Sequence, residues 1–285
     1  MEIKNVTVIG SGTMGSGIVY VAAANGYKVV MNDVSKEILD KAMDRIRNQI
    51  MGGIQRGKMN PKEAEEMFYR ISTNEKMEEA VKNADLVIEA VYENMEVKKQ
   101  VFQRVDNAAP EHAILASNTS TLSITEIGSV TKRPEQVIGL HFFNPPAAMK
   151  LVEVVVGEKT AENTVNVAKE FVVSLGKTPI VAKDSPGFIV NRILVPVLNE
   201  AIKLYDEGVS DIESIDKAMV LGANFPVGPF ALADMVGLDV ALASMRTLEE
   251  KLGPCYKPSK SLVELVEKGH LGMKTGKGFY EYKKQ

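Results

Sequence analysis

The segment from Gly10 to Gly15, Gly-Ser-Gly-Thr-Met-Gly, constrains the fold of this chain more than any other feature. An apolar run over Lys4–Ile9 precedes it, and a run rich in small residues over Thr13–Asn25 follows it. This order predicts a buried strand, a tight turn and a helix. A second apolar run over Tyr27–Met31 completes a βαβ unit.

The three glycines of this segment have separate physical tasks. Gly10 permits the tight turn, Gly12 lets the backbone approach a pyrophosphate, and Gly15 lets the helix pack closely on the strand. Asp33 ends the second strand, where its carboxylate can bond a ribose diol and would repel a 2′-phosphate. We therefore expect a dinucleotide site in which NAD is favoured over NADP, although Asn32 and Lys36 beside Asp33 leave that preference to be tested. The expected cofactor residues here are Gly10, Ser11, Gly12, Thr13, Met14, Gly15 and Asp33.

Strand and helix patterns alternate through the rest of the first 184 residues. The alternation predicts an α/β fold with a Rossmann-type doubly wound sheet. A long charged helical pattern over 35–69 reads as a helical arm, interrupted at Gly52-Gly53 and Gly57 and resumed at Pro61. The expected strands also include 70–73, 86–90, 114–117, 137–142, 151–156 and 179–182, and the expected helices include 75–81, 95–107 and 160–175.

The pattern changes after Lys183-Asp-Ser-Pro-Gly187, because only helical periodicity follows. We expect an NAD-binding Rossmann domain over 1–184 and a smaller all-α C-terminal domain for substrate binding and dimerisation over 185–285. Its helices are expected at 188–207, 212–221, 230–252 and 261–268. Such a small core suggests packing against the first domain or a second subunit, so we expect a homodimer or higher homo-oligomer. The apolar positions predicted to make that contact are Leu194, Val197, Leu198 and Ile202.

Composition excludes several classes of protein. Lysine and arginine number 34 against 37 aspartate and glutamate, so no basic excess indicates nucleic-acid binding. Cys255 is the only cysteine, and the spacing of His112, His141 and His270 fits no metal site. The amino terminus lacks a signal-peptide pattern, and no apolar run reaches about 18 residues. We expect a cytoplasmic protein without a metal or a membrane partner.

His141 and Glu153 are candidates for a general base and its partner, because they lie symmetrically about Ala147. If the connection Asn144–Met149 turns the chain back antiparallel, these two residues face each other across the strands. The carboxylate can then hold the imidazole in one tautomer. A core histidine bonded to a carboxylate for structure alone is the competing interpretation.

Four further motifs occur in order: 117–120 (Ser-Asn-Thr-Ser), 184–192 (Asp-Ser-Pro-Gly-Phe-Ile-Val-Asn-Arg), 224–229 (Asn-Phe-Pro-Val-Gly-Pro) and 274–280 (Lys-Thr-Gly-Lys-Gly-Phe-Tyr). With the His141 segment they make the chain resemble the L-3-hydroxyacyl-CoA dehydrogenases, from Gly10 to Tyr280. It is most similar to the compact, stand-alone members that interconvert 3-hydroxybutyryl-CoA and acetoacetyl-CoA in butyrate-type metabolism. Pro146 lies one residue earlier than the second proline of the usual family turn.

The resemblance implies that His141 is the general base, Glu153 its partner and Ser120 a hydrogen-bond partner of the substrate oxygen. It also implies that Asn191, in the second domain, closes over the substrate. These roles suit the oxidation of a secondary alcohol, in which the hydroxyl proton leaves as a hydride departs. Ser120 could instead cap the turn toward Ile124, and Asn191 could cap a helix.

The resemblance further implies that Glu93, Lys98 and Asn144 contact the nicotinamide half of the cofactor. Glu93 and Lys98 could equally form a solvated pair at a helix end. Lys274 is also implied in cofactor binding, but Met273 stands where an arginine commonly precedes that lysine, which weakens a phosphate-binding role for the tail.

Coenzyme A is expected against the helical arm, where Arg47, Arg56 and Lys58 are the available cations. Each could instead be a solvated arm residue. Arg56 and Lys58, with Ser120, are the expected contacts of the acyl-CoA substrate.

The expected activity is that of an NAD-dependent (3S)-3-hydroxyacyl-CoA dehydrogenase for short chains, with His141 as general acid and base. One alternative is a relative that acts on another hydroxyacyl-CoA, such as hydroxyadipyl-CoA, or on a free hydroxy acid. Another is a dinucleotide-binding protein that has lost turnover.

Overall fold

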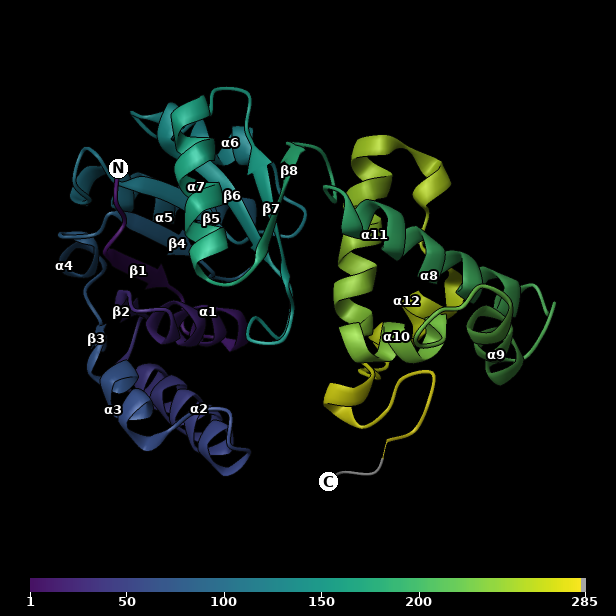
Figure 1. Ribbon diagram of the computed structural model, residues 1–285. Helices are drawn as coiled ribbons and strands as arrows, with labels where there is room; N and C mark the ends of the chain where they lie inside the picture. Colours follow the sequence, from purple (N-terminus) through teal and green to yellow (C-terminus); the bar gives the residue numbers. More distant parts are fainter. Residues whose placement is uncertain (283–285) are drawn as a thin grey trace. The chain divides into compact units, whose positions relative to one another are not determined.

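The computed structural model describes residues 1–282, and the chain divides into two compact units, Met1–Asp184 and Ser185–Gln285. Figure 1 shows that the first unit holds the strands and that the second is helical. Within residues 1–282 no helix has the length and apolar character needed to cross a membrane.

The strands of the described chain form one eight-stranded sheet in the order β3-β2-β1-β4-β5-β6-β7-β8. Neighbouring strands from β3 through to β6 are parallel, whereas β7 runs antiparallel to β6 and parallel to β8. The strand order reverses between β1 and β4, which is where open α/β sheets bind their ligands. The strands are β1 (Asn5–Ile9), β2 (Lys28–Asn32), β3 (Ile71–Asn74), β4 (Leu86–Glu89), β5 (Ile114–Ser117), β6 (Val137–Phe142), β7 (Leu151–Val156) and β8 (Thr178–Lys183).

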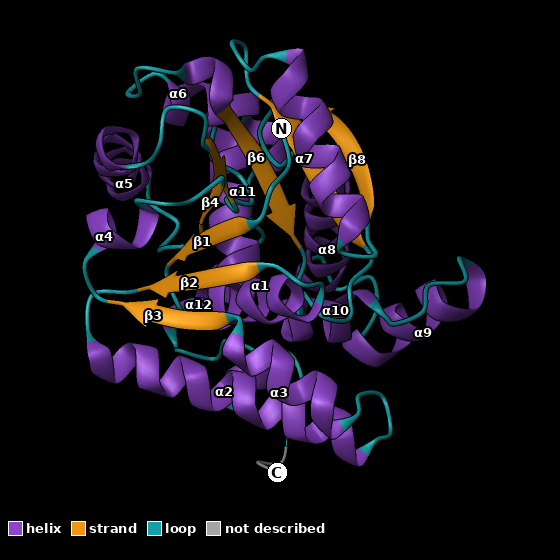
Figure 2. Ribbon diagram, turned by 60° about the vertical axis from the view of Figure 1, so that its left-hand side comes forward, coloured by secondary structure: helices purple, strands orange, loops and turns teal. Residues whose placement is uncertain are grey.

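Helices cover both faces of this sheet, as Figures 1 and 2 show. Side chains alternate along each strand, so Leu86 and Ile88 of β4 join the core beneath α1 and α7, whereas Val87 and Glu89 face α5. The prediction of a doubly wound α/β fold is therefore confirmed. The helices of this unit are α1 (Thr13–Ala24), α2 (Lys36–Gln55), α3 (Pro61–Tyr69), α4 (Met77–Val81), α5 (Met95–Ala108), α6 (Ile124–Gly128) and α7 (Glu162–Ser174).

The helical arm consists of α2 and α3, which lie side by side in Figure 2. The predicted interruption at Gly52-Gly53 is wrong, because α2 continues through both glycines to Gln55. Its apolar stripe, which includes Ile46 and Ile50, packs on the core and outweighs the low helix propensity of glycine. A capping box at Asn60 and Glu63 then starts α3.

The second unit contains α8 (Val190–Asp206), α9 (Ile212–Gly222), α10 (Pro229–Val236), α11 (Leu238–Leu252) and α12 (Lys260–Glu267). The helix predicted over 230–252 is in fact two helices, because Gly237 has a φ of 102° and ends α10. Leu198 and Ile202 of α8 lie in the core of this unit. The prediction that they form a subunit contact is therefore wrong, because their surface is already covered by their own chain.

Two glycine substitutions test the backbone conformations of Gly53 and Gly237, and they are expected to change stability in opposite directions. Gly53→Ala should stabilise the first unit by about 0.5–1 kcal/mol, because the new Cβ meets Met59 Cβ at an ordinary 3.7 Å and alanine favours a helix. Gly237→Ala should destabilise the second unit by about 1–3 kcal/mol, because its φ suits only glycine. Calorimetric melting of both variants checks the two signs, and a destabilising Gly53→Ala would restore the predicted break in α2.

Candidate active site

The centre of the candidate site is the strand pair that carries His141 and Glu153. The two residues are directly opposite each other in the antiparallel register of β6 and β7. Glu153 Oε2 lies 2.7 Å from His141 Nδ1, and both residues are buried. With the carboxylate accepting from Nδ1, Nε2 is the ring nitrogen suited to exchange a proton. The ring of Phe143 lies against the imidazole, with 4.4 Å between ring centroids.

The turn between these two strands is fixed from two sides. Lys177, just before β8, donates to the carbonyl oxygens of Pro146 and Met149 at 2.5 and 2.7 Å. Burial lowers the pKa of Lys177 from its ordinary value. On the other side, the ring of Pro146 packs on α1 at Gly17, where an added Cβ would lie 2.8 Å from Pro146 Cδ. The turn that links His141 to Glu153 is thus seated on the helix that follows the glycine loop.

Ser120 lies in a turn after β5 that is organised by Glu93. Glu93 Oε1 accepts hydrogen bonds from Thr119 Oγ1 at 2.5 Å, from Ser120 N at 2.9 Å and from Ser120 Oγ at 3.2 Å. Thr121 N donates to the same oxygen at 3.2 Å. The helix that begins at Ile124, α6, is capped by the side chain of Ser123 and not by Ser120.

Partial burial raises the pKa of Glu93, but the Lys98 ammonium and the donors of the 119–121 turn outweigh this effect. The pKa of this carboxyl therefore lies below its usual range. Glu93 thus stays a charged hydrogen-bond acceptor for the turn throughout the neutral pH range.

The glycine loop has the geometry that a bound pyrophosphate needs. Gly10 has a φ of 95°, and a Cβ at Gly15 would lie 1.9 Å from the Gly10 carbonyl oxygen. A Cβ at Gly12 would meet nothing within 4 Å, so this side of the loop is open to a ligand. Asp33 Oδ2 accepts from Ser11 N at 2.7 Å and Ser11 Oγ at 2.8 Å. Asp33 Oδ1 accepts from Val34 N at 2.7 Å and can accept one further bond, which fits a ribose hydroxyl. Thr13 and Met14 begin α1 directly after the loop.

Two interactions near the loop were not anticipated from the sequence. Arg45 of α2 donates to the carbonyl oxygen of Ser11 at 2.5 Å and so ties the arm to the loop. The alternative of Lys98 as half of a solvated pair is wrong, because its side chain is only 1% exposed and its Nζ lies 2.7 Å from Glu89 Oε1. The sequence signal for this pair was the placement of Glu89 at the end of an otherwise apolar strand, Leu-Val-Ile-Glu.

Three of the remaining candidates lie on the helical arm, and Asn144 lies just after the strand that carries His141. Arg56 and Lys58 are exposed in the connection between α2 and α3. Arg47 is paired with Asp44 at 2.6 Å and its guanidinium lies 5.4 Å from the ring centroid of Phe68. Asn144 is exposed directly after β6.

Asn191 and Lys274 belong to the second unit. Asn191 is the second residue of α8, whose cap residue is Ile189, so its alternative role as a helix cap is wrong. Lys274 Nζ lies 2.6 Å from Asp239 Oδ2. The tail that follows Lys274 is held by buried Asp234, which accepts from the backbone N–H groups of Phe279 and Tyr280. Lys274 is therefore part of an ordered tail.

Comparison with known proteins shows that the chain matches one protein family over both of its units. Residues 5–185 match the model described as 3-hydroxyacyl-CoA dehydrogenase, NAD binding domain, and residues 187–282 match the C-terminal domain model of the same family. The chain is 46% identical over 286 residues to a probable 3-hydroxybutyryl-CoA dehydrogenase of Bacillus subtilis, covering 100% of this chain and 99% of the relative. It is 45% identical to the 3-hydroxybutyryl-CoA dehydrogenase of Clostridioides difficile, covering 98% and 99%.

A solved structure also matches the chain over nearly its whole length. The crystal structure of (S)-3-hydroxybutyryl-CoA dehydrogenase from Ralstonia eutropha superposes with a TM-score of 0.95 at 41% identity, and the match covers 99% of this chain and 100% of that one. The likeness extends over the whole fold, including both units.

Gly17→Ala tests whether the turn is seated on α1. Alanine in a helix normally gains about 1 kcal/mol over glycine, but overpacking costs about 1–3 kcal/mol. Because the Cβ would overlap Pro146, we expect a lower melting temperature and faster hydrogen exchange at Ala148 and Met149, whose amides bond the Pro145 carbonyl.

Gly53→Ala is the matched control, because it makes the same chemical change inside a helix at ordinary contact distance. A Gly17→Ala variant that melts higher than wild type, with unchanged exchange in the turn, would show that Pro146 is not held there.

Proposed function

The chain belongs to the 3-hydroxyacyl-CoA dehydrogenase family, and from this premise we propose that it interconverts (3S)-3-hydroxybutyryl-CoA and acetoacetyl-CoA with NAD. The names of the curated relatives support this choice of substrate. The structural observation that carries the proposal is the buried His141–Glu153 pair, 2.7 Å apart, on a turn that packs against the helix following the glycine loop.

His141 serves as the general acid and base of the proposed reaction. In the oxidative direction its Nε2 accepts the hydroxyl proton of the substrate, and in the reductive direction it returns that proton to the ketone oxygen. The nicotinamide cofactor, when bound, would accept the hydride in oxidation and return it in reduction. The glycine loop and Asp33 would hold the phosphates and ribose of that cofactor.

Glu153 positions the imidazole rather than carrying the proton. Its carboxylate holds Nδ1 and stabilises the imidazolium that forms during alcohol oxidation. The Ser120 hydroxyl, which donates to Glu93 Oε1 in the structure, turns to donate to the reacting oxygen and so favours charge developing there. The turn contacts of Glu93 support this role, because they fix the backbone on both sides of Ser120. Asn191, from the second unit, is proposed to orient the substrate thioester.

The remaining contacts complete the proposal. Glu93, Lys98 and Asn144 are assigned to the nicotinamide half of the cofactor, and Lys274 to the cofactor from the second unit. Arg56 and Lys58 are assigned to the coenzyme A phosphates, since both are exposed cations of the arm.

We also propose a homodimer and a cytoplasmic location. Large apolar side chains of the second unit remain exposed on its helices and in the connection between α8 and α9, which supports a subunit contact at positions other than the buried Leu198 and Ile202. These exposed residues include Ile193, Val209, Leu221, Met235 and Val240. Light scattering at micromolar concentration tests the dimer. The single, exposed Cys255 is compatible with a reducing compartment, which cell fractionation tests.

A substrate comparison tests the proposed function directly. We expect NADH-dependent reduction of acetoacetyl-CoA and a far lower kcat/KM with free acetoacetate, because contacts to the phosphates and pantetheine contribute to transition-state binding. Equal values for the two substrates would remove coenzyme A from the proposal and favour a dehydrogenase of free hydroxy acids. An absence of turnover with both, despite NADH binding, would favour a non-catalytic dinucleotide-binding protein.

Glu153→Gln tests the electrostatic part of the mechanism. The amide keeps a hydrogen-bonding group but removes the charge that favours imidazolium. Ketone reduction needs the protonated ring, so the variant should lose most activity at the high end of the pH range, and its rate should start to fall at a lower pH than in wild type. Superimposable pH profiles of kcat/KM would mean that the charge of Glu153 does not act on His141.

A further inference from the structure

Glu89 is a buried acid at the carboxyl end of β4, and none of the proposed catalytic steps uses it. Its Oε1 accepts from Lys98 Nζ and from Val91 N, both at 2.7 Å. Its Oε2 accepts from Ser117 Oγ at 2.6 Å. The side chain therefore joins the ends of two neighbouring strands to α5.

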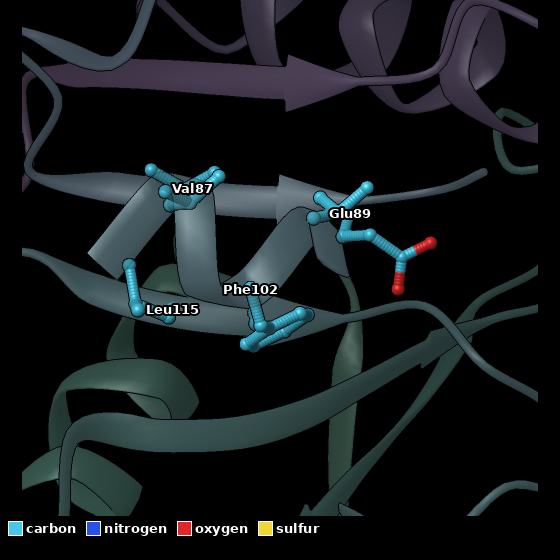
Figure 3. A pocket seen from close by; sticks show the side chains of 7 residues that line it. Val87, Glu89, Phe102 and Leu115 are labelled. Atoms are coloured by element: carbon cyan, nitrogen blue, oxygen red, sulfur yellow. The ribbon is translucent and has the colours of Figure 1, made fainter. Parts of the chain in front are cut away.

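Water has no room to solvate this carboxylate from the side of α5. Figure 3 shows Glu89 beside Phe102 at the end of β4, with Val87 and Leu115 nearer the starts of their strands. These apolar side chains line a pocket too narrow for a water molecule. The negative charge of Glu89 is thus balanced by Lys98, whose side chain is 1% exposed. Removing one member of such a pair leaves a buried charge without its counter-ion, which is costly.

Two routes lead from Glu89 to the turn at 119–121. Through Oε1, Lys98 Nζ is shared with Glu93 Oε2 at 3.2 Å, and the other oxygen of Glu93 accepts the donors of the turn. Through Oε2, the Ser117 hydroxyl that donates to Glu89 accepts from Thr119 N at 3.2 Å. Both oxygens of one buried carboxylate are therefore linked through one further residue or pair of residues to the same turn.

We propose that Glu89 is a positioning residue that sets the turn carrying Ser120, through Lys98 and Glu93 on one side and through Ser117 on the other. The kinetic consequence rests on the role proposed for Ser120 at the substrate oxygen. The Lys98 ammonium lies between two carboxylates, so its attraction to Glu89 weakens its attraction to Glu93. Without the charge of Glu89, the ammonium is drawn to Glu93 alone and competes with the donors of the turn for its oxygens.

Hydrogen exchange of the full-length protein tests the positioning without any assay of turnover. Glu89→Gln keeps the size of the side chain and removes its charge. The amides of Ser120 and Thr121, which donate to Glu93, should exchange on the order of 10-fold faster, corresponding to the loss of about 1.4 kcal/mol of protection. The amides of β1 should exchange as in wild type. Glu96→Gln is the matched control, because Glu96 lies on α5 like Lys98 but has a side chain that is 77% exposed.

A kinetic cycle with Ser120→Ala separates positioning from a merely structural effect. Glu89→Gln should lower kcat/KM for acetoacetyl-CoA on the order of 10–100-fold, the size of effect expected when a reacting group is displaced by about 1 Å. In the Ser120→Ala background the further loss should stay within about twofold, because the group being positioned is already absent. If the double variant loses the full product of the two single losses in kcat/KM, then Glu89 has a structural role only.

Ser117→Ala keeps the proposal testable if Glu89→Gln does not fold. It removes the bond to Glu89 Oε2 and the acceptor of Thr119 N while leaving the charge pair intact. We expect the same coupling to Ser120 with smaller losses, and faster exchange at Thr119. Unchanged exchange over 119–121 in every variant that folds would overturn the proposal. If the wild type does not turn over acetoacetyl-CoA but the variants show these changes in exchange, the proposed substrate is rejected and the positioning role is retained.

Discussion

The antiparallel pairing of β6 with β7 is the constraint on which the candidate active site depends. A parallel connection needs a crossover of a dozen or more residues, whereas an antiparallel one needs only a short turn. The reversal after β6 therefore lets residues 12 positions apart in sequence meet side by side in the sheet. Burial of both partners makes their interaction strong and specific, because the surroundings offer the imidazole Nδ1 no competing water.

The carboxyl ends of the parallel strands gather the other polar groups around this pair. Glu89 ends β4, Ser117 ends β5, and the glycine loop follows β1. Each buried carboxylate there has defined partners: Glu153 is held by His141, and Glu89 by Lys98 and Ser117. Charges fixed in this way keep their orientation during a reaction, so the polar edge of the sheet is prepared for a substrate before it binds.

Sequence reasoning succeeded where a local pattern decides the structure. The strands at 137–142 and 151–156 have the predicted bounds, because both are apolar runs bounded by a proline-containing turn. It failed where long-range packing overrides propensity, as in α2, which continues through Gly52-Gly53 because its apolar stripe is buried. The sequence did not predict the break at Gly237, because the apolar periodicity continues on both sides of it.

The charge network around Lys98 could not be predicted for a different reason. A lysine in the first turns of a charged helix normally lies in solvent, and only the three-dimensional neighbourhood of β4 and β5 shows that two carboxylates surround it. Spacing in sequence identified Glu93 and Lys98 as a pair but could not identify the more deeply buried partner, Glu89.

A double-mutant cycle on His141 and Glu153 tests the proposed mechanism most directly. His141→Ala should lower kcat for acetoacetyl-CoA reduction by about 10²–10⁴-fold, with NADH affinity almost unchanged. If Glu153 acts through His141, adding Glu153→Gln to that variant should cost little more, since the positioned ring is already gone. A double variant that loses the full product of the two single effects would contradict the mechanism and show that the two residues act independently.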